Sequence, residues 1–370
     1  MKLITYNIIF SIGKMHILLG FMYSIDFKRL KEWFLAEKRS LPWRHHPSPY
    51  AVWVSEVMLQ QTQVSVVIPY FHRWMQRFPS IASLAEADLD EIIKLWEGLG
   101  YYSRARSLHQ AAQYVVNHHQ GQLPSNEEEL KKIKGLGPYT VGAILSFAFR
   151  QRAAAVDGNV IRVLSRYFEI KEDFAKNKTV NNLRKIALEI LPEDEAWIQN
   201  EALIELGATI CKKKPKCMEC PLRSSCKGYR NSTAQQLPFK STKVETSYLY
   251  RAVPIIIFDN KLLVKRGQKG EIMSDLHEFP YFETPPLGWS YQRLQEEMFL
   301  QWSLETQYIK ELPQVKHSFT RYQASLKPVL FHSSYERPIT DHTWLTHETL
   351  MQLAFSSGHR RIFMDLNLKT

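Results

Sequence analysis

The chain has 370 residues, of which 45% are hydrophobic, and a formal net charge of +11. This length supports two domains with cores of their own, which excludes a small scaffold held together by disulfide bonds. The positive charge suits a polyanionic partner such as nucleic acid, although charge alone is a weak indication of one.

The first 23 residues are apolar, but Lys14 and His16 interrupt them. No small-residue cleavage site follows, and the run is too short for a membrane span. We expect residues 1–23 to be an extension outside the fold, with Met15 and Met22 as alternative starts. No later segment is long and apolar enough to cross a membrane, and we expect reduced thiols, which are typical of a cytoplasmic protein.

Three regions follow along the chain. Between residues 24 and 227, apolar residues recur at spacings of three and four, which predicts helices. Residues 228–246 are polar and basic without any period, and we interpret them as an interdomain linker. In 247–370, two β-rich runs flank Asp259-Asn260, which predicts a hairpin, and later strand-like runs alternate with helical stretches. This last region is therefore predicted to be an α+β domain.

Gly135 and Gly137 flank Leu136 in a turn between two helical stretches, and Pro138 follows directly. Pro138 suits the first position of a helix, whose free N–H groups attract phosphate. A simple tight turn is the alternative. In a basic chain we favour a helix-hairpin-helix that grips the DNA backbone without reading bases, with both glycines as DNA-binding residues.

Two carboxylates are candidates for chemistry. Asp157 precedes a helix whose apolar face begins at Val160, and as its cap it should stay ionised because it accepts N–H bonds. Glu56 lies mid-helix among apolar neighbours, where desolvation would raise its pKa toward that of a proton donor. Taken singly, a structural cap and an exposed glutamate are the ordinary explanations. Together, one acid and one anion suit cleavage of a glycosidic bond through an oxocarbenium-like state.

All the cysteines of the chain lie within sixteen residues, and from 211 to 243 nine Lys or Arg residues stand against one acid, Glu219. Such a basic segment suits contact with phosphates. Four thiolates at short spacings suit either tetrahedral zinc or a [4Fe–4S] cluster. The candidate ligands are Cys211, Cys217, Cys220 and Cys226.

Four motifs together with the cysteines resemble the MutY-type adenine DNA glycosylases of the endonuclease III-like helix-hairpin-helix superfamily. They read SEVMLQQTQV, GLGYYSRAR, VDGNVIRV and NEALIELGATIC. The resemblance runs from about residue 26 to 370. It implies a mainly α region, a six-helix barrel with helix-hairpin-helix and iron–sulfur loop, followed by an α+β Nudix-like domain. It also implies a monomer, associated with the nucleoid, that removes adenine opposite 8-oxoguanine or G from duplex DNA and leaves an abasic site.

The resemblance assigns roles to single residues. Glu56 protonates the adenine leaving group, Asp157 stabilises the sugar cation or its covalent adduct, and Tyr139 and Asn159 assist at the same sugar. Bifunctional relatives carry a lysine where this chain has Tyr139, and a phenol cannot form a Schiff base, so monofunctional base removal is expected.

The resemblance further assigns residues that contact the flipped base and the duplex. Core packing is the alternative role for Leu59, Leu99 and Tyr101. The adenine pocket is expected to include Trp43, Arg44, Leu59 and Glu201, and the residues beside the lesion are expected to be Gln61, Leu99 and Tyr101.

The same resemblance favours a [4Fe–4S] cluster over zinc on the four cysteines, in a loop at 211–226. The first cysteine gap has five residues, where the superfamily commonly has six. The cluster is expected to shape a basic loop for phosphate contact.

Asp275–Pro280 matches a strand motif of the Nudix-like domain, which reads 8-oxoguanine in this family. No Nudix helix with paired glutamates follows, so pyrophosphatase activity is not expected. The lesion-probing loop reads Phe319-Thr320-Arg321 where relatives commonly have Phe-Ser-His, so we expect lesion discrimination to be weaker or differently tuned. The rival interpretations are another base-excision glycosylase and a non-catalytic iron–sulfur DNA-binding protein.

Overall fold

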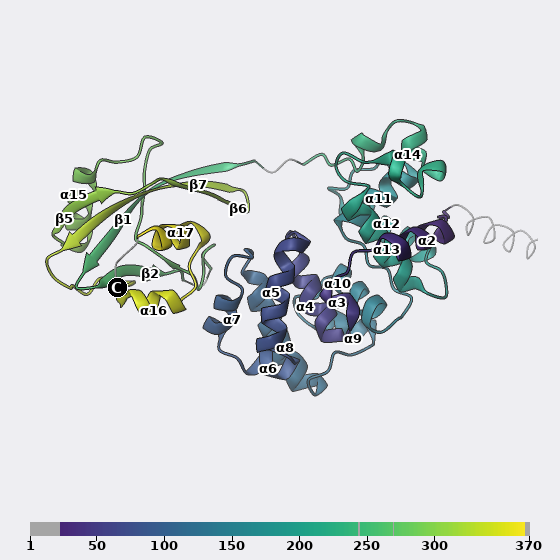
Figure 1. Ribbon diagram of the computed structural model, residues 1–370, viewed down its shortest axis with the longest axis horizontal. Helices are drawn as coiled ribbons and strands as arrows, with labels where there is room; N and C mark the ends of the chain where they lie inside the picture. The colour runs from purple at the N-terminus through teal and green to yellow at the C-terminus, as the bar shows by residue number, and fades with distance from the viewer. Residues whose placement is uncertain (1–22, 243–244, 269, 367–370) are drawn as a thin grey trace, which may run out of the picture. The chain divides into compact units, whose positions relative to one another are not determined.

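The structure is a computed structural model that describes residues 23–242, 245–268 and 270–366. Apart from Tyr23, the predicted N-terminal extension lies outside these residues. Contacts divide the chain into two compact units, which are coloured by residue number in Figure 1. We call Met1–Met75 with Tyr114–Lys243 the helical unit, and Gln76–Gln113 with Val244–Thr370 the mixed unit. No helix within the described residues is long and apolar enough to span a bilayer.

Every regular element in the described part of the helical unit is a helix, which confirms the predicted mainly α region. Helices α5 and α8 continue into the mixed unit. The elements are α2 (Phe27–Glu37), α3 (Pro42–His45), α4 (Pro49–Leu59), α5 (Val64–Arg77), α8 (Ser103–His119), α9 (Glu127–Lys132), α10 (Pro138–Ala143), the π-helix η1 (Ile144–Ala148), α11 (Gly158–Phe168), α12 (Asn177–Glu189), α13 (Ala196–Thr209), the short η2 (Cys217–Glu219) and η3 (Arg223–Ser225), α14 (Lys227–Arg230) and η4 (Ala234–Gln236).

Helix α4 is a buried helix because it is apolar on all sides. The Ser48 side chain caps it by accepting from the Ala51 N–H, and Pro49 fills its first position. Every residue from Tyr50 to Met58 is buried. A helix that is hydrophobic all round belongs in a core, and its one carboxylate, Glu56, is carried inside with it.

Helices α9 and α10 form the predicted helix-hairpin-helix. Gly135, between them, has a φ of +96°, which favours glycine, and Gly137 is the N-cap of α10. Pro138 follows at the first helical position, as the sequence predicts. The hairpin places the start of α10, and with it Tyr139, next to α4.

The segment after the last cysteine differs from the predicted linker. Helix α14 and η4 occupy its first part, and Arg166 Nε donates to the Leu237 carbonyl at 2.9 Å. The Phe174 N–H donates to the Phe239 carbonyl at 2.9 Å, and the Ser241 hydroxyl to Asp173 at 2.6 Å. Residues 228–241 thus pack on the rest of the helical unit. Their sequence shows no periodicity, but residues distant in the sequence form hydrogen bonds with their backbone groups.

The mixed unit contains an eight-stranded sheet whose main path runs β3-β2-β1-β7-β5. Strand β1 pairs in parallel with β7 from Ser247–Tyr322 to Ile257–His332, and antiparallel with β2 through the predicted Asp259-Asn260 turn. The strands are β1 (Ser247–Phe258), β2 (Lys261–Arg266), β3 (His277–Glu278), β4 (Phe282–Glu283), β5 (Thr306–Glu311), β6 (Val315–Phe319), β7 (Tyr322–Ser333) and β8 (His342–Thr346).

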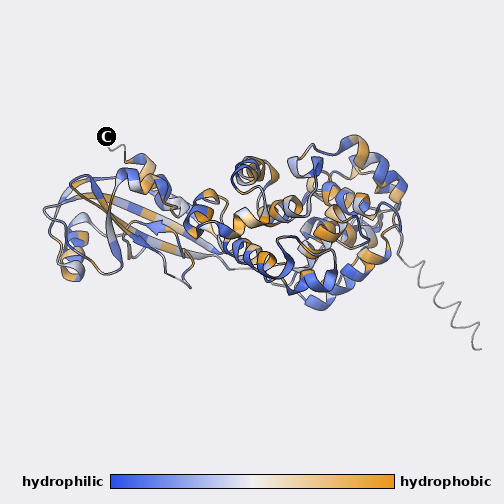
Figure 2. Ribbon diagram, turned by 90° about the horizontal axis from the view of Figure 1, so that it is seen from below, coloured by the Kyte–Doolittle hydropathy of each residue, from blue (hydrophilic) through white to orange (hydrophobic). Residues whose placement is uncertain are grey.

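Helices cover both faces of this sheet, which confirms the predicted α+β class. Alternate residues of β1 enter different cores: Ile255 packs with Phe363 of α17, and Ile256 packs with Met298 of α15. Figure 2 shows hydrophobic residues (orange) interleaved with hydrophilic ones (blue) along these strands and helices, as the alternation requires. The helices of the unit are α6 (Ile81–Glu86), α7 (Leu89–Leu95), α15 (Tyr291–Trp302), α16 (His347–Gln352) and α17 (Ser357–Asp365).

Residues 76–113 lie within the predicted helical region but cluster with residues 244–370, which we call the C-terminal domain. This segment holds α6, α7 and the start of α8. Polar side chains of α7 and the following loop bond to the C-terminal part of the chain, as described below. A helical spacing predicts the helices but not the partner on which they pack.

Candidate active site

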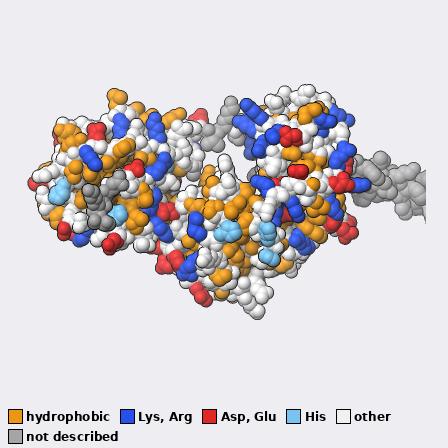
Figure 3. Space-filling view, in the orientation of Figure 1, with side chains coloured by type: hydrophobic (Ala, Val, Ile, Leu, Met, Phe, Trp, Pro, Cys, Tyr) orange, Lys and Arg blue, Asp and Glu red, His pale blue; other side chains and the backbone are white. Residues whose placement is uncertain are grey.

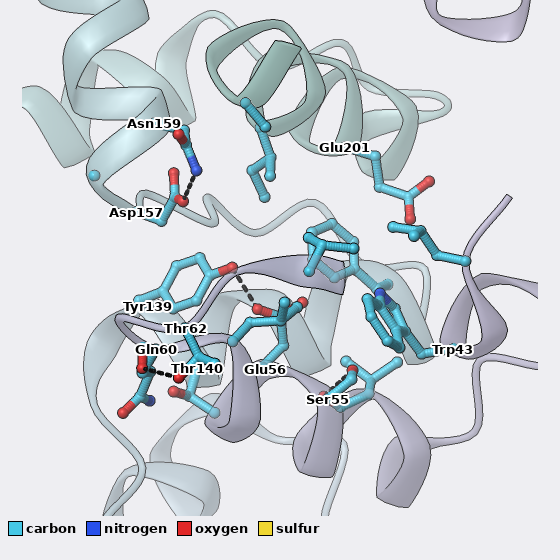
Figure 4. Close-up of a pocket in the computed structure, with 18 of the residues that line it drawn as sticks. Trp43, Ser55, Glu56, Gln60, Thr62, Tyr139, Thr140, Asp157, Asn159 and Glu201 are labelled. Atoms are coloured by element: carbon cyan, nitrogen blue, oxygen red, sulfur yellow. Dashed lines mark hydrogen bonds between the residues drawn. The ribbon is translucent and has the colours of Figure 1, made fainter. Parts of the chain in front are cut away.

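A cavity of about 610 Å³ opens in the helical unit where α4, α10, α11 and α13 meet. Figure 4 shows side chains from these elements pointing into it. All the residues assigned by resemblance to catalysis or to the adenine pocket line this cavity, together with Gln61, Gly135 and Gly137. They are Trp43, Arg44, Glu56, Leu59, Tyr139, Asp157, Asn159 and Glu201.

Glu56 is 6% exposed and accepts a hydrogen bond from the Tyr139 hydroxyl. Burial raises the pKa of Glu56 to about 7, with smaller contributions in the same direction from Asp157 and Glu201. The Tyr139 hydrogen bond and the Arg44 charge oppose this shift. The direction is the one that the mid-helix position predicts, and it leaves Glu56 partly protonated near neutral pH.

Asp157 caps α11 as predicted. Its Oδ1 accepts from the Val160 N–H at 2.8 Å and its Oδ2 from Asn159 Nδ2 at 2.6 Å (Figure 4). Burial nevertheless raises the pKa of Asp157, because desolvation outweighs these bonds and the Arg162 charge. The cap position predicted an ionised Asp157 from its hydrogen bonds, and the desolvation that opposes them depends on the tertiary fold. The two carboxylates still differ in their hydrogen bonds, because Asp157 accepts a backbone N–H bond as a helix cap and Glu56 does not.

Tyr139 lies in the first turn of α10, and its hydroxyl points at Glu56 (Figure 4). Burial and the two nearby carboxylates raise the pKa of Tyr139 well above its ordinary value. The phenol therefore stays protonated and acts as a hydrogen-bond donor to Glu56. It offers no amine that could form an imine.

The far side of the pocket holds an ion cluster that the sequence did not reveal. Arg44 lies between Glu201, at 3.3 Å, and the fully buried Glu205, at 2.9 Å, while Arg39 also pairs with Glu205. Burial raises the pKa of Glu205, but the bonds from Arg39 and Arg44 outweigh it and lower the pKa overall. Glu205 follows Glu201 by four residues on α13, and this i,i+4 spacing was the available signal.

Arg162 is a second residue that the sequence analysis missed. Its Nη2 donates to Asn159 Oδ1 at 2.8 Å, and its Nε donates to the Cys211 carbonyl at 2.7 Å. Asn159 in turn donates to Asp157. One arginine on α11 therefore joins the backbone of the cysteine segment to the polar side chains of the pocket.

The four cysteines carry free thiols and line one small cavity together with Arg166. Arg166 Nη1 lies 3.4 Å from Cys211 Sγ and donates to the Lys212 carbonyl at 2.6 Å. Nowhere in the described chain do three or more His, Cys, Asp or Glu side chains converge closely enough for a single metal ion.

The remaining residues assigned to DNA contact lie in the mixed unit. Leu99 is 6% exposed, so the free protein uses it for packing, whereas Tyr101 is 38% exposed. Phe319 ends β6, and the exposed Thr320 and Arg321 form the turn to β7.

On the face shown in Figure 3, basic and acidic side chains are interspersed over both units, so the net positive charge is not gathered into one patch there.

Comparisons with known proteins relate this chain to base excision repair proteins. Residues 54–191 match the family described as HhH-GPD superfamily base excision DNA repair protein. The adenine DNA glycosylase of Buchnera aphidicola subsp. Baizongia pistaciae is 39% identical over 260 residues, covering 68% of this chain and 72% of that protein. The rat adenine DNA glycosylase is 32% identical over 396 residues, covering 91% and 77%.

A solved structure supports the fold of the helical region. A thermostable thymine-DNA glycosylase is 26% identical, with a TM-score of 0.51, and the match covers 60% of this chain and 99% of that one. Together, the site, the family match and the two relatives show that this chain belongs to the adenine DNA glycosylase family.

Proposed function

We propose that this protein, as a monomer on duplex DNA, hydrolyses the N-glycosidic bond of adenine opposite 8-oxoguanine or G. The observation that carries the proposal is a buried carboxyl, Glu56, with a pKa of about 7, in one cavity with the capped carboxyl of Asp157. The names of the two relatives support adenine as the base. The cavity volume of about 610 Å³ leaves room for a flipped nucleoside.

In the proposed reaction, Glu56 donates its proton to a ring nitrogen of adenine. The bond from the sugar C1′ to the base then breaks, and its electron pair leaves with the protonated adenine. The Asp157 carboxylate stabilises the positive charge that develops on the sugar, and Asn159 orients it. Water adds to C1′ and returns a proton to Glu56, which leaves an abasic site.

The proposed enzyme does not cut the DNA strand. Strand cleavage by this superfamily requires an amine that forms a Schiff base with the opened sugar, and the corresponding residue here is Tyr139. We expect no borohydride-trappable complex between the wild-type protein and its substrate.

The C-terminal domain is proposed to read the base opposite adenine. Strands β6 and β7 pair up to Phe319–Tyr322, so Thr320 and Arg321 form a two-residue hairpin tip. Both are exposed, and Arg321 lies over the Tyr322 ring with 5.3 Å between the guanidinium carbon and the ring centroid. Thr320 offers a hydroxyl and Arg321 a permanent cation to a partner.

We also propose that Cys211, Cys217, Cys220 and Cys226 hold a [4Fe–4S] cluster. When bound, such a cluster would fold the basic loop 211–226 into a fixed shape. Arg166 would donate to the thiolate of Cys211, since its Nη1 already lies 3.4 Å from that sulfur. The loop's lysines would then contact phosphates.

The test is a single-turnover assay that measures free adenine released from duplexes with A opposite 8-oxoguanine, G, C or T, followed by alkali. A duplex with T opposite G tests the thymine activity named for the solved neighbour. We expect adenine release with 8-oxoguanine and G, and none after Glu56→Gln, which should keep DNA affinity. Glu172→Gln, at an exposed position outside the cavity, is the control and should be fully active. Thymine release, or adenine release by Glu56→Gln, would contradict the proposal.

A further inference from the structure

Glu97 lies between helix α7 and the GLGYYSRAR motif, and it bonds to Phe355 and Arg360 of the C-terminal domain and to Lys94 of α7. Its Oε1 accepts from the Phe355 N–H at 2.9 Å and from Arg360 Nε at 2.7 Å. Its Oε2 accepts from Arg360 Nη2 at 3.2 Å and from Lys94 Nζ at 2.8 Å. The side chain is 17% exposed, as is that of Arg360. A two-point bond from an arginine fixes both distance and orientation.

A second contact lies at the other end of the same motif. Arg106 Nη1 donates to Asp275 Oδ2 at 3.0 Å and to the Ser274 carbonyl at 3.1 Å. Arg266 bonds to Asp90 at 3.1 Å and lies 3.7 Å from Asp275. Ion pairs thus join α7 and α8 to the C-terminal domain on both sides of the loop between them.

This loop, Gly98–Tyr102, carries Leu99 and Tyr101, two of the three residues predicted to fill or wedge the duplex. From the first turn of α8, Arg104 donates to the Leu99 and Gly100 carbonyls at 3.3 and 3.0 Å. Trp96 Nε1 donates to the Gly100 carbonyl at 3.1 Å. Residues on both sides of the loop therefore hold its backbone carbonyls in place.

The hairpin that is predicted to probe the lesion connects to Arg360 through close packing. Helix α17, which bears Arg360, packs on β6 with no free space at Gly358, where an added Cβ would lie 2.5 Å from His317 Nδ1. The His317 ring stacks on Phe319, with 5.1 Å between their centroids. The base of the hairpin and helix α17 are therefore in direct, close-packed contact.

We propose that Glu97 is a positioning residue through which the lesion-reading hairpin sets the position of the loop Gly98–Tyr102. The base opposite adenine contacts the hairpin and shifts its position. This shift passes from Phe319 and His317 to Arg360 and Glu97, and it changes how readily adenine is extruded. The inference rests on the proposed function, and deepens it by naming the contact that joins recognition to base extrusion.

The test compares wild-type protein, Glu97→Gln, Arg360→Gln and the double variant in single-turnover adenine release opposite 8-oxoguanine and opposite G. We expect each single variant to slow release opposite 8-oxoguanine by about tenfold, while release opposite G changes by less than about twofold. The double variant should be no slower than either single one, because both remove the same contact. Fluorescence of 2-aminopurine in place of adenine, in a Glu56→Gln background, should show reduced extrusion in the same variants.

Arg77→Gln is the matched control, because it breaks an exposed ion pair with Glu91 that involves no residue of the C-terminal domain. It should behave as wild type. Should a Glu97 variant fail to fold, Arg106→Gln tests the second anchor with the same expected loss. The inference would be overturned if Glu97→Gln slowed release equally on both substrates or left the ratio of the two release rates unchanged. It would also be overturned if the folded wild-type enzyme showed no preference for 8-oxoguanine. Absence of any adenine release by the wild type would instead overturn the proposed function.

Discussion

At the scale of single residues, burial decides the chemistry of the pocket. Glu56 and Asp157 both have raised pKa values because both are desolvated, but Asp157 accepts a cap bond from the Val160 N–H and a second bond from the Asn159 side chain, whereas Glu56 accepts one bond from a phenol. Hydrogen bonds from N–H groups favour the charged form. The pocket therefore holds one carboxyl suited to giving a proton and another suited to facing a cation.

The buried Glu56 should make the protein less stable at alkaline pH. Its folded-state pKa of about 7 lies above the ordinary value of 4.5, so the folded state binds the proton more tightly. The resulting penalty is absent below pH 4.5, grows up to about pH 7, and amounts to roughly 3 kcal/mol above it. Glu56→Gln should thus raise the unfolding free energy in denaturant titrations at pH 8 and not at pH 4.5. A variant that is less stable than wild type at pH 8 would contradict this account.

At the scale of elements, sequence reasoning succeeded where a local signal exists. The Asp259-Asn260 turn has positive φ at both residues, 40° and 61°, and these residue types tolerate such angles. The sequence of helix α4 predicts its burial because apolar residues occupy all of its faces. Glu205 and Arg162 were missed because their roles depend on partners brought together by folding, Arg44 for the first and the Cys211 carbonyl for the second.

The cysteine loop gives a prediction about its metal. We expect visible absorbance and about four irons per chain in protein purified without oxygen. Cys226→Ser should lower the iron content and weaken DNA binding, because the basic loop loses its shape, and metal analysis with a binding titration would measure both. One zinc per chain and no iron would contradict the proposed cluster.

At the scale of the whole molecule, the division of the chain is the feature that sequence patterns could not provide. Residues 76–113 read as part of one helical region, yet Glu97 and Arg106 bind Arg360 and Asp275. The two residues of each pair are separated by well over a hundred positions in the sequence. A charged residue at the end of a helix also gives the same sequence pattern whether its side chain faces solvent or pairs with another part of the chain. The fold class of each region was predictable from periodicity, whereas the assignment of helices to units required the tertiary contacts.

The hairpin tip carries the prediction for substrate preference. Arg321→His replaces an exposed permanent cation by a side chain that is mostly neutral at pH 7.5, closer to the residue common in relatives. We expect the ratio of release rates, 8-oxoguanine over G opposite adenine, to rise severalfold. Equal ratios in the two proteins would mean that Arg321 does not contact the opposite base.

The pH dependence of adenine release tests the central role of Glu56 most directly. The single-turnover rate opposite 8-oxoguanine should fall about tenfold per pH unit above the Glu56 pKa of about 7, because only the protonated carboxyl can donate. Tyr139→Phe removes a hydrogen bond that lowers this pKa, so the same fall should begin at higher pH. A rate that stays level or rises between neutral and alkaline pH would contradict protonation of the leaving base by Glu56.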